Sequence, residues 1–149
     1  MNLGAIVRIE LAESNKVLAK ASAGARRALM KQGAYLRTVA KRSISTKPKP
    51  SRPGHPPRSV TGLLRDFLIF RFDQSAQSIV VGPAFLSGSK VKPTIPEILE
   101  TGGVEMSMVR RGRGYQRRPV AIAPRPYMAP ALERSQQKLS QFWKDSLLT

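Results

Sequence analysis

Cysteine is absent from the 149-residue chain, and histidine and tryptophan each occur once. The chain therefore forms no disulfide, offers no thiolate to a metal and has no cysteine nucleophile. It contains no run of 18 apolar residues, so we expect no membrane-spanning helix. The N-terminal residues lack a basic segment and a small-residue cleavage site, so we expect no secretory signal and synthesis in the cytosol.

Acidic residues are scarce, since nine Asp and Glu accompany 26 Lys and Arg and leave a net charge of +17. Like surfaces of so basic a protein repel one another, whereas polyanions and acidic protein surfaces attract it. One hypothesis is therefore a basic nucleic-acid-binding module associated with DNA or the ribosome. The length favours a single domain with a modest core, which is compatible with that function or with a role in an assembly.

Groups that could carry out catalysis are few. His55 lies between Gly54 and Pro56, where no packed neighbour is expected to orient it as a base. Glu97 and Glu100 could form a carboxylate pair, but neither a histidine nor a further acid nearby completes a metal site. We predict no catalytic residue, no metal ligand and no cofactor, and we expect His55→Ala to leave function intact. A small hydrolase is the least favoured hypothesis.

A long helix is predicted from Ser14 to Ile44, because alanine, leucine and valine recur there at three- and four-residue spacing. Many of these residues are small, so a partner element should approach the helix closely. Gly24 and Gly33 each weaken the helix by about 1 kcal/mol relative to alanine. The preceding segment, Ala5 to Leu11, is compatible with a short strand or with an extra helical turn.

An extended loop is predicted over Lys47 to Pro57, because five prolines there fix φ and remove backbone donors. In an assembly this basic loop could lie as an arm on a neighbouring subunit. Its positive charge comes from Lys47, Lys49, Arg52 and Arg58. The candidate contacts with a subunit or partner in this loop are Arg52, His55 and Arg58.

Four strands are predicted after this loop. Phe67 to Phe72 has apolar side chains on both faces, which is typical of a central strand, and Ser78 to Val81 pairs with it as a hairpin. Thr94 to Glu97 has the spacing of a capping box and predicts a short helix. Val104 to Val109 and Tyr115 to Ala123 then form a second hairpin.

A C-terminal helix is predicted with Pro130 near its start. One stripe of large apolar residues is expected to dock this helix on the sheet, namely Leu132, Leu139, Trp143 and Leu147. If Trp143 is fully buried, its replacement by alanine should cost about 3–5 kcal/mol.

The predicted fold class is therefore α+β, with two helices packed on a small antiparallel sheet of about four strands. The single domain comprises a long helix at 14–44, a projecting proline-rich loop at 45–60, the sheet with an inserted short helix at 61–126, and the C-terminal helix at 127–148.

The second hairpin has a strongly basic tip, where Gly112 and Gly114 alternate with arginines and Tyr115 is interleaved. Arginine forks pair with phosphates, but one tyrosine is no stacking platform for bases. An acidic protein surface and a polyanion remain equal alternatives as its partner. The candidate contacts are Arg110, Arg111, Arg113, Tyr115, Arg117 and Arg118.

Four separated segments resemble the tail-completion (head–tail joining) proteins of tailed bacteriophages, the family that includes the minor tail protein Z group. They are Pro53–Pro57 with Thr61–Arg65, the strand end Val81–Pro83, the short helix Ile95–Gly103, and Arg125–Leu132. Each segment is common by itself, and their order over most of the chain is more specific. The chain departs from the family pattern at Gly102–Gly103 and at Phe67, where Gly-Thr and a small polar residue are more usual.

This resemblance implies a non-enzymatic structural protein located in the neck or tail of a virion. It implies a ring of identical subunits, commonly six-fold, between a head-side connector or adaptor protein and the tail tube or terminator protein. With a charge of +17, such a ring needs a strongly acidic neighbour or DNA in its lumen to offset repulsion.

Overall fold

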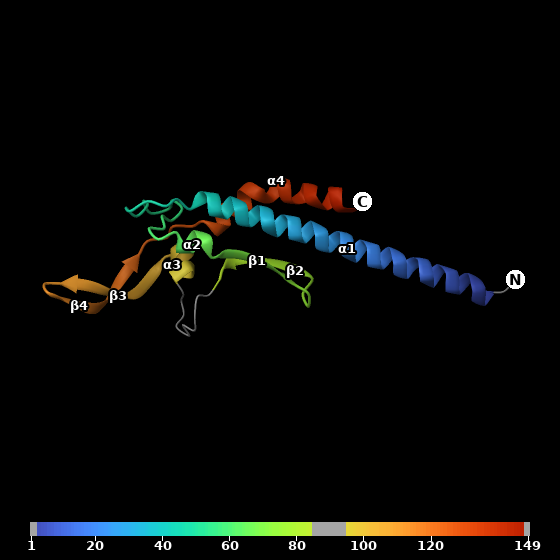
Figure 1. Cartoon of the computed structure of the whole chain (residues 1–149), viewed down its shortest axis with the longest axis horizontal. Helices are drawn as coiled ribbons and strands as arrows, with labels where there is room; N and C mark the ends of the chain where they lie inside the picture. Colours follow the sequence, from blue (N-terminus) through green and yellow to red (C-terminus); the bar gives the residue numbers. More distant parts are fainter. Residues whose placement is uncertain (1–2, 85–94, 148–149) are drawn as a thin grey trace.

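The computed structural model describes the backbone of residues 3–84 and 95–147, and the side chains of residues 21–84 and 95–145. In chain order the elements are α1 (Leu3–Ser43), α2 (Leu63–Asp66), β1 (Leu68–Asp73), β2 (Ser78–Pro83), α3 (Ile95–Thr101), β3 (Gly103–Arg111), β4 (Gly114–Ile122) and α4 (Met128–Leu147). The molecule is elongated, with α1 and α4 side by side and the β3–β4 hairpin reaching away from them (Figure 1). The predicted α+β class is confirmed.

Helix α1 has 41 residues, which corresponds to about 60 Å at 1.5 Å per residue. The segment from Ala5 to Leu11 is helical, so the second of the two alternatives for it is confirmed. Gly33 is a weak helix former, and the close approach of the β1–β2 hairpin explains its position in α1. A Cβ atom there would lie 2.6 Å from Cγ1 of Ile79 and 2.9 Å from Cδ2 of Phe70, so glycine lets the β1–β2 hairpin approach α1 closely.

Helix α4 runs antiparallel to the C-terminal half of α1. Nε2 of Gln32 donates to the carbonyl oxygen of Leu139 at 2.9 Å. The rings of Tyr35 and Phe142 meet edge to face with centroids 5.8 Å apart. Small residues such as Ala28, which is fully buried, keep the helices close.

The prediction that α4 docks on the sheet through a stripe of large residues is wrong. Leu132 is 46% exposed, Trp143 is 37% exposed and Leu139 is half-buried, while the buried residues in the described part of α4 are Ala131 and the polar Ser135. The main contact of α4 is with α1. The hydroxyl of Ser135 donates to the Ala131 carbonyl oxygen at 2.6 Å, so burying it leaves no unsatisfied group. The fourth residue of the predicted stripe, Leu147, has its side chain outside the described part of the chain.

The core lies where the C-terminal end of α1 meets the start of β1 and the start of α4. Its fully buried members are Ala40, Ile44, Leu68, Tyr127 and Ala131. Nε of Arg37 donates to the Leu68 carbonyl oxygen at 2.7 Å, which satisfies a backbone acceptor beside this core. Leu36, Val39, Leu64, Leu99 and Met128 surround the core as partly buried neighbours.

The four strands form two separate antiparallel pairs, β1–β2 and β3–β4, instead of one sheet. The prediction of a central first strand is therefore wrong. Phe70 pairs with Val81 on the face that packs against α1, whereas Ile69 and Val80 on the opposite face are 45% and 60% exposed. Apolar residues on both faces suggested a strand covered on two sides, but within the described residues only the α1 side of this pair is packed.

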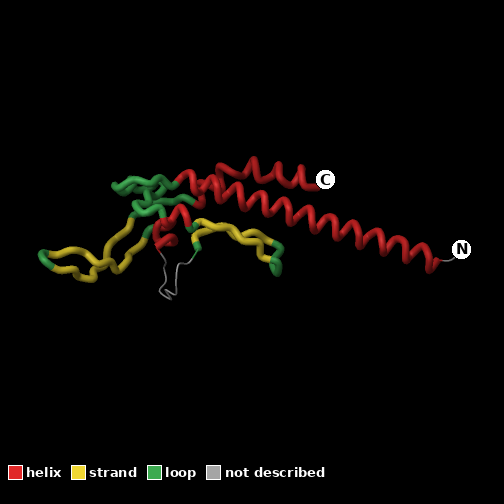
Figure 2. The backbone as a smooth tube through the Cα atoms, in the orientation of Figure 1, coloured by secondary structure: helices red, strands yellow, loops and turns green. Residues whose placement is uncertain are grey.

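The remaining predicted elements lie near their expected positions. The helical turn α2 follows Gly62, which has a φ of 79°. Residues 45–60 form the expected extended loop, with a single bridge between Ser45 and Arg58. The short helix α3 begins at Ile95, and its proposed cap, Thr94, lies outside the described residues. Figure 2 shows the loop of residues 45–60 at the C-terminal end of α1.

Candidate functional site

The β3–β4 hairpin is a two-stranded arm of nine residues per strand. Its two-residue turn, Gly112–Arg113, has a φ of 61° at Gly112, the positive value that a type II′ turn requires at its first central position. Apart from its contact with β4, strand β3 contacts α3. Figure 1 shows the arm reaching away from the helices.

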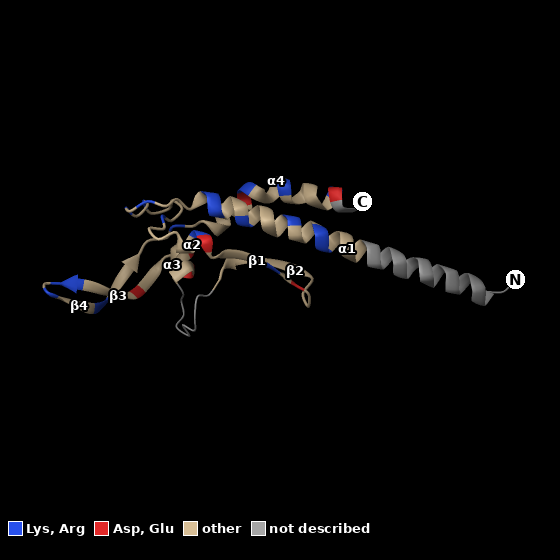
Figure 3. Ribbon diagram, viewed as in Figure 1, with Lys and Arg blue, Asp and Glu red and all other residues tan. Residues whose placement is uncertain are grey.

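Every residue from Met106 to Pro119 is exposed, including all five arginines of the tip and Tyr115. The register pairs Arg110 with Tyr115 and Met108 with Arg117, which places these four side chains on one face. Arg111 and Arg118 lie on the other face. Arginines therefore lie on both faces of the tip, and a flat surface could meet only part of them. Figure 3 shows basic residues gathered at this end of the arm.

The stem of the arm has an uncovered apolar face. Val104, Met106 and Met108 share this face and are 60%, 46% and 61% exposed. Met106 pairs with Pro119, a residue without a backbone N–H that is tolerated at the edge of a sheet. Two-stranded hairpins are at best marginally stable alone in water, so this arm gains stability if a partner covers the apolar face.

The proline-rich loop is anchored to the rest of the protein. The N–H of Gly54 donates to the Pro124 carbonyl oxygen at 2.8 Å, and Nε of Arg125 donates to that of Ser51 at 3.1 Å. Arg52, His55 and Arg58 are exposed and line one pocket together with Lys49 and Ser51. The structure thus brings the three candidate residues of the loop together, in a pocket that contains none of the described tip residues.

Glu100 has a structural role that the sequence interpretation did not assign. Its Oε2 accepts the N–H groups of Tyr127 and Met128 at 3.0 and 3.2 Å, and its Oε1 accepts that of Ala129 at 2.9 Å. The first turn of α4 contains no acid of its own. A carboxylate from α3 therefore caps the N-terminus of α4, where unpaired N–H groups and the helix dipole both favour negative charge.

The segments that carry the family resemblance converge around this cap. The N–H of Arg125 donates to the Leu99 carbonyl oxygen at 2.6 Å, which joins the third segment to the fourth. The bond from Gly54 to Pro124 joins the first segment to the residue before the fourth. Val81, from the second segment, lines an apolar cavity of about 580 Å³ together with Glu100 and Met128.

Burial raises the pKa of Tyr127 to about 12, and the Glu100 carboxylate adds to the rise. Unfolded tyrosine titrates near 10, so the folded chain binds more protons between these values and the free energy of unfolding falls as pH rises. We expect a loss of about 1–2 kcal/mol between about pH 10 and 12, after allowance for solvent screening. Urea unfolding at several pH values measures this loss, as the difference in the free energy of unfolding between the natural chain and Tyr127→Phe. Parallel pH profiles for the two chains would contradict this assignment.

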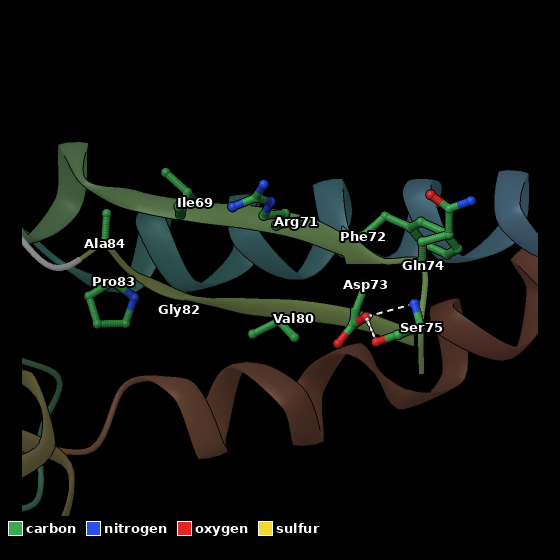
Figure 4. Close-up of a pocket in the computed structure, with 10 residues that line it drawn as sticks. All are labelled: Ile69, Arg71, Phe72, Asp73, Gln74, Ser75, Val80, Gly82, Pro83 and Ala84. Carbon is green, nitrogen blue, oxygen red and sulfur yellow. Dashed lines mark hydrogen bonds between the residues drawn. The ribbon is translucent and has the colours of Figure 1, made fainter. Parts of the chain in front are cut away.

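A cavity of about 760 Å³ lies along the β1–β2 hairpin (Figure 4). Its acidic residue, Asp73, accepts the N–H and hydroxyl of Ser75 at 2.9 and 2.6 Å, and the N–H of Ala76 at 3.2 Å. These bonds, led by that from the Ser75 hydroxyl, hold the pKa of Asp73 below its usual value. The Asp73 carboxylate therefore stabilises the turn between β1 and β2.

Two searches of the described residues give negative results. No group of three His, Asp or Glu side chains among them is arranged to hold a metal ion. No helix in that part of the chain has both the length and the hydropathy needed to cross a bilayer.

Comparison with known proteins finds no matching family model, no matching curated protein and no matching solved structure.

Proposed function

We propose that the protein is a structural component of a tailed-phage particle, which forms a ring at the head–tail junction and joins the completed tail or neck to the head. The observation that carries this proposal is the uncovered β3–β4 arm. Its stem exposes Val104, Met106 and Met108, and its tip presents arginines on both faces. An arm of this kind suits a subunit whose stable form includes its neighbours.

The convergence of the resembling segments supports the same proposal. Gly54, Leu99, Glu100 and Arg125 come from segments that are distant in the chain, yet all belong to one hydrogen-bonded junction at the start of α4. The resemblance thus rests on residues that make one structural unit. It supplies the expected partners: further copies of the chain, with six-fold symmetry favoured, a head-side connector or adaptor, a tail tube or terminator, and DNA in the lumen.

A ring can be tested directly with the purified protein. We expect negative-stain images of rings and a solution mass of about six times the 16.4 kDa chain at moderate salt, where repulsion between basic subunits is screened. Met106→Asp combined with Met108→Asp should reduce the mass to that of a monomer, because charge on an exposed apolar face prevents its burial in an interface. The variant should stay folded, since both side chains are exposed in the single chain.

Ser107→Asp is the matched control, because Ser107 lies on the same strand with its side chain on the opposite face. It should assemble as the natural chain does. A monomeric natural chain at all salt concentrations, in the presence of phage neck components, would contradict the proposal.

A basic nucleic-acid-binding module is the second candidate function. The observation that favours it is the tip, because a two-stranded β-ribbon fits the major groove of DNA and arginine forks pair with phosphates. Such a module should bind free DNA or RNA as a monomer, so a natural chain that binds nucleic acid without forming rings would favour this function.

A further inference from the structure

The proline-rich loop contains a second basic site, separate from the arm. Its pocket has a volume of about 530 Å³ and is lined by Lys49, Pro50, Ser51, Arg52, His55 and Arg58. None of the described residues that line it is acidic. Three cationic side chains and one imidazole therefore line the same pocket. The high net charge of the chain does not by itself require basic residues to gather in one pocket.

The loop holds these side chains in a fixed frame. The N–H of His55 donates to the Arg52 carbonyl oxygen at 3.2 Å, which closes a turn between two of them. Nη1 of Arg58 lies 3.4 Å from the Lys49 carbonyl oxygen, across the loop. Beneath them, Arg125 and Pro124 fix the backbone of Ser51 and Gly54. Prolines limit the remaining freedom of the segment, so little entropy is lost when a ligand binds.

Ser51 provides an independent indication of a ligand. It is 8% exposed, and its hydroxyl is shielded from solvent without a hydrogen-bond partner among the described residues. Buried hydroxyls in folded proteins are normally paired, because an unpaired one loses its bonds to water without compensation. An unpaired donor beside three cationic side chains is the arrangement that an oxyanion satisfies.

We infer that this pocket binds a phosphate-type oxyanion, held by Lys49, Arg52 and Arg58. The Ser51 hydroxyl, which no hydrogen bond holds in its shielded position, rotates toward the anion and donates to it. Two sources share this chemistry: a free phosphate ion, and a phosphodiester of a nucleic-acid strand. The inference does not depend on a neck role for the protein, because it concerns the loop and not the arm.

The test uses His55, which as the only histidine gives a single imidazole signal in the proton NMR spectrum. Titration with inorganic phosphate at constant pH and ionic strength should shift this signal saturably, whereas chloride should not. Arg58→Gln should weaken phosphate binding about tenfold, the effect of losing one charge-assisted contact. Arg110→Gln makes the same change of charge on the arm and should leave phosphate binding unchanged.

Ser51→Ala separates ligand binding from packing. It should lower phosphate affinity without lowering the free energy of unfolding, because it removes a hydroxyl that has no partner in the folded chain. Repeating the titration with a short single-stranded DNA identifies the source. If DNA shifts the His55 signal at lower concentration than phosphate and Arg58→Gln abolishes the difference, a phosphodiester is the ligand. If phosphate shifts the His55 signal at the same concentration as DNA does, the free ion is the ligand.

The inference is overturned if neither anion shifts the His55 signal. It is also overturned if Arg58→Gln and Arg110→Gln weaken binding equally, because the effect would then be that of total charge alone. Either result leaves the ring proposal untouched, since ring formation is measured by mass and imaging.

Discussion

Glu100→Ala should lower the free energy of unfolding by about 2–4 kcal/mol, because three N–H groups at the start of α4 lose a charged acceptor together. The loss is large for a cap, since ordinary caps contribute about 1 kcal/mol and interact with fewer donors. The substitution also removes the hydrogen bonds between Glu100 of α3 and the start of α4, next to the fully buried Tyr127. Urea unfolding followed by circular dichroism measures it.

Glu133→Ala is the control for loss of negative charge, because Glu133 is an exposed carboxylate in α4, the helix that Glu100 caps from α3. It should change the free energy of unfolding by less than about 0.5 kcal/mol. Glu100→Gln keeps one acceptor oxygen and should fall between the natural chain and Glu100→Ala. Equal stability of the Glu100 and Glu133 alanine variants would show that the observed cap does not stabilise the fold.

If the protein joins head to tail as proposed, replacing all five tip arginines by glutamine should abolish joining while the subunit stays folded. The arginines are exposed, so the isolated chain loses no packing, but a partner surface loses every cationic contact at the tip. Electron microscopy of infected cells should then show filled heads and tails that remain separate. Normal joining combined with lost nucleic-acid binding would favour the basic-module function, and the salt dependence of binding should then flatten by about one unit per phosphate contact removed.

The two faces of the tip allow a sharper version of this experiment. Arg110 and Arg117 lie on one face, and Arg111 and Arg118 lie on the other. A partner that receives the tip in a cleft should be weakened by either double glutamine substitution. A partner with a flat surface should be weakened by only one of them, and the sensitive pair would identify the face that docks.

The spacing of apolar residues was sufficient to predict the long helix α1, and capping and proline signals added the two later helices, because these are local properties of the chain. Both hairpins follow from turn residues such as Gly112, whose positive φ is accessible to glycine at little cost. The number of sheets could not be predicted in this way. Whether Phe67–Phe72 lies within a sheet or at the side of a helix depends on contacts between distant segments, which alternation along one strand does not specify.

The buried side of α4 was mispredicted for a related reason. The interpretation ranked residues by size and hydropathy, and so chose Trp143 over Ser135. The structure buries Ser135 on a helix that packs against α1, and the serine hydroxyl finds an acceptor one turn earlier, at Ala131. Close packing of two helices thus favours small residues over large apolar ones.

The arginine tip could be predicted because clustered basic residues are visible in the sequence, whereas the role of Glu100 was missed because it depends on contacts in space. Clustered arginines identify the tip directly from the sequence. The role of Glu100 requires knowledge that its carboxylate reaches an N-terminus 27 to 29 residues later in the chain. One available signal was the first turn of α4, which begins near Met128 without an acid or other capping side chain of its own.

Pro119 gives the arm two unequal edges. The outer edge of β4 lacks one N–H donor near its middle, whereas the outer edge of β3 from Gly103 to Arg111 contains no proline. A strand from another molecule that added to β4 would lose a ladder bond there, but one that added to β3 would not. Accidental growth of the sheet is therefore disfavoured at the β4 edge and not at the β3 edge. A fibril needs pairing through both edges of every arm, so the donor that Pro119 lacks opposes propagation from molecule to molecule.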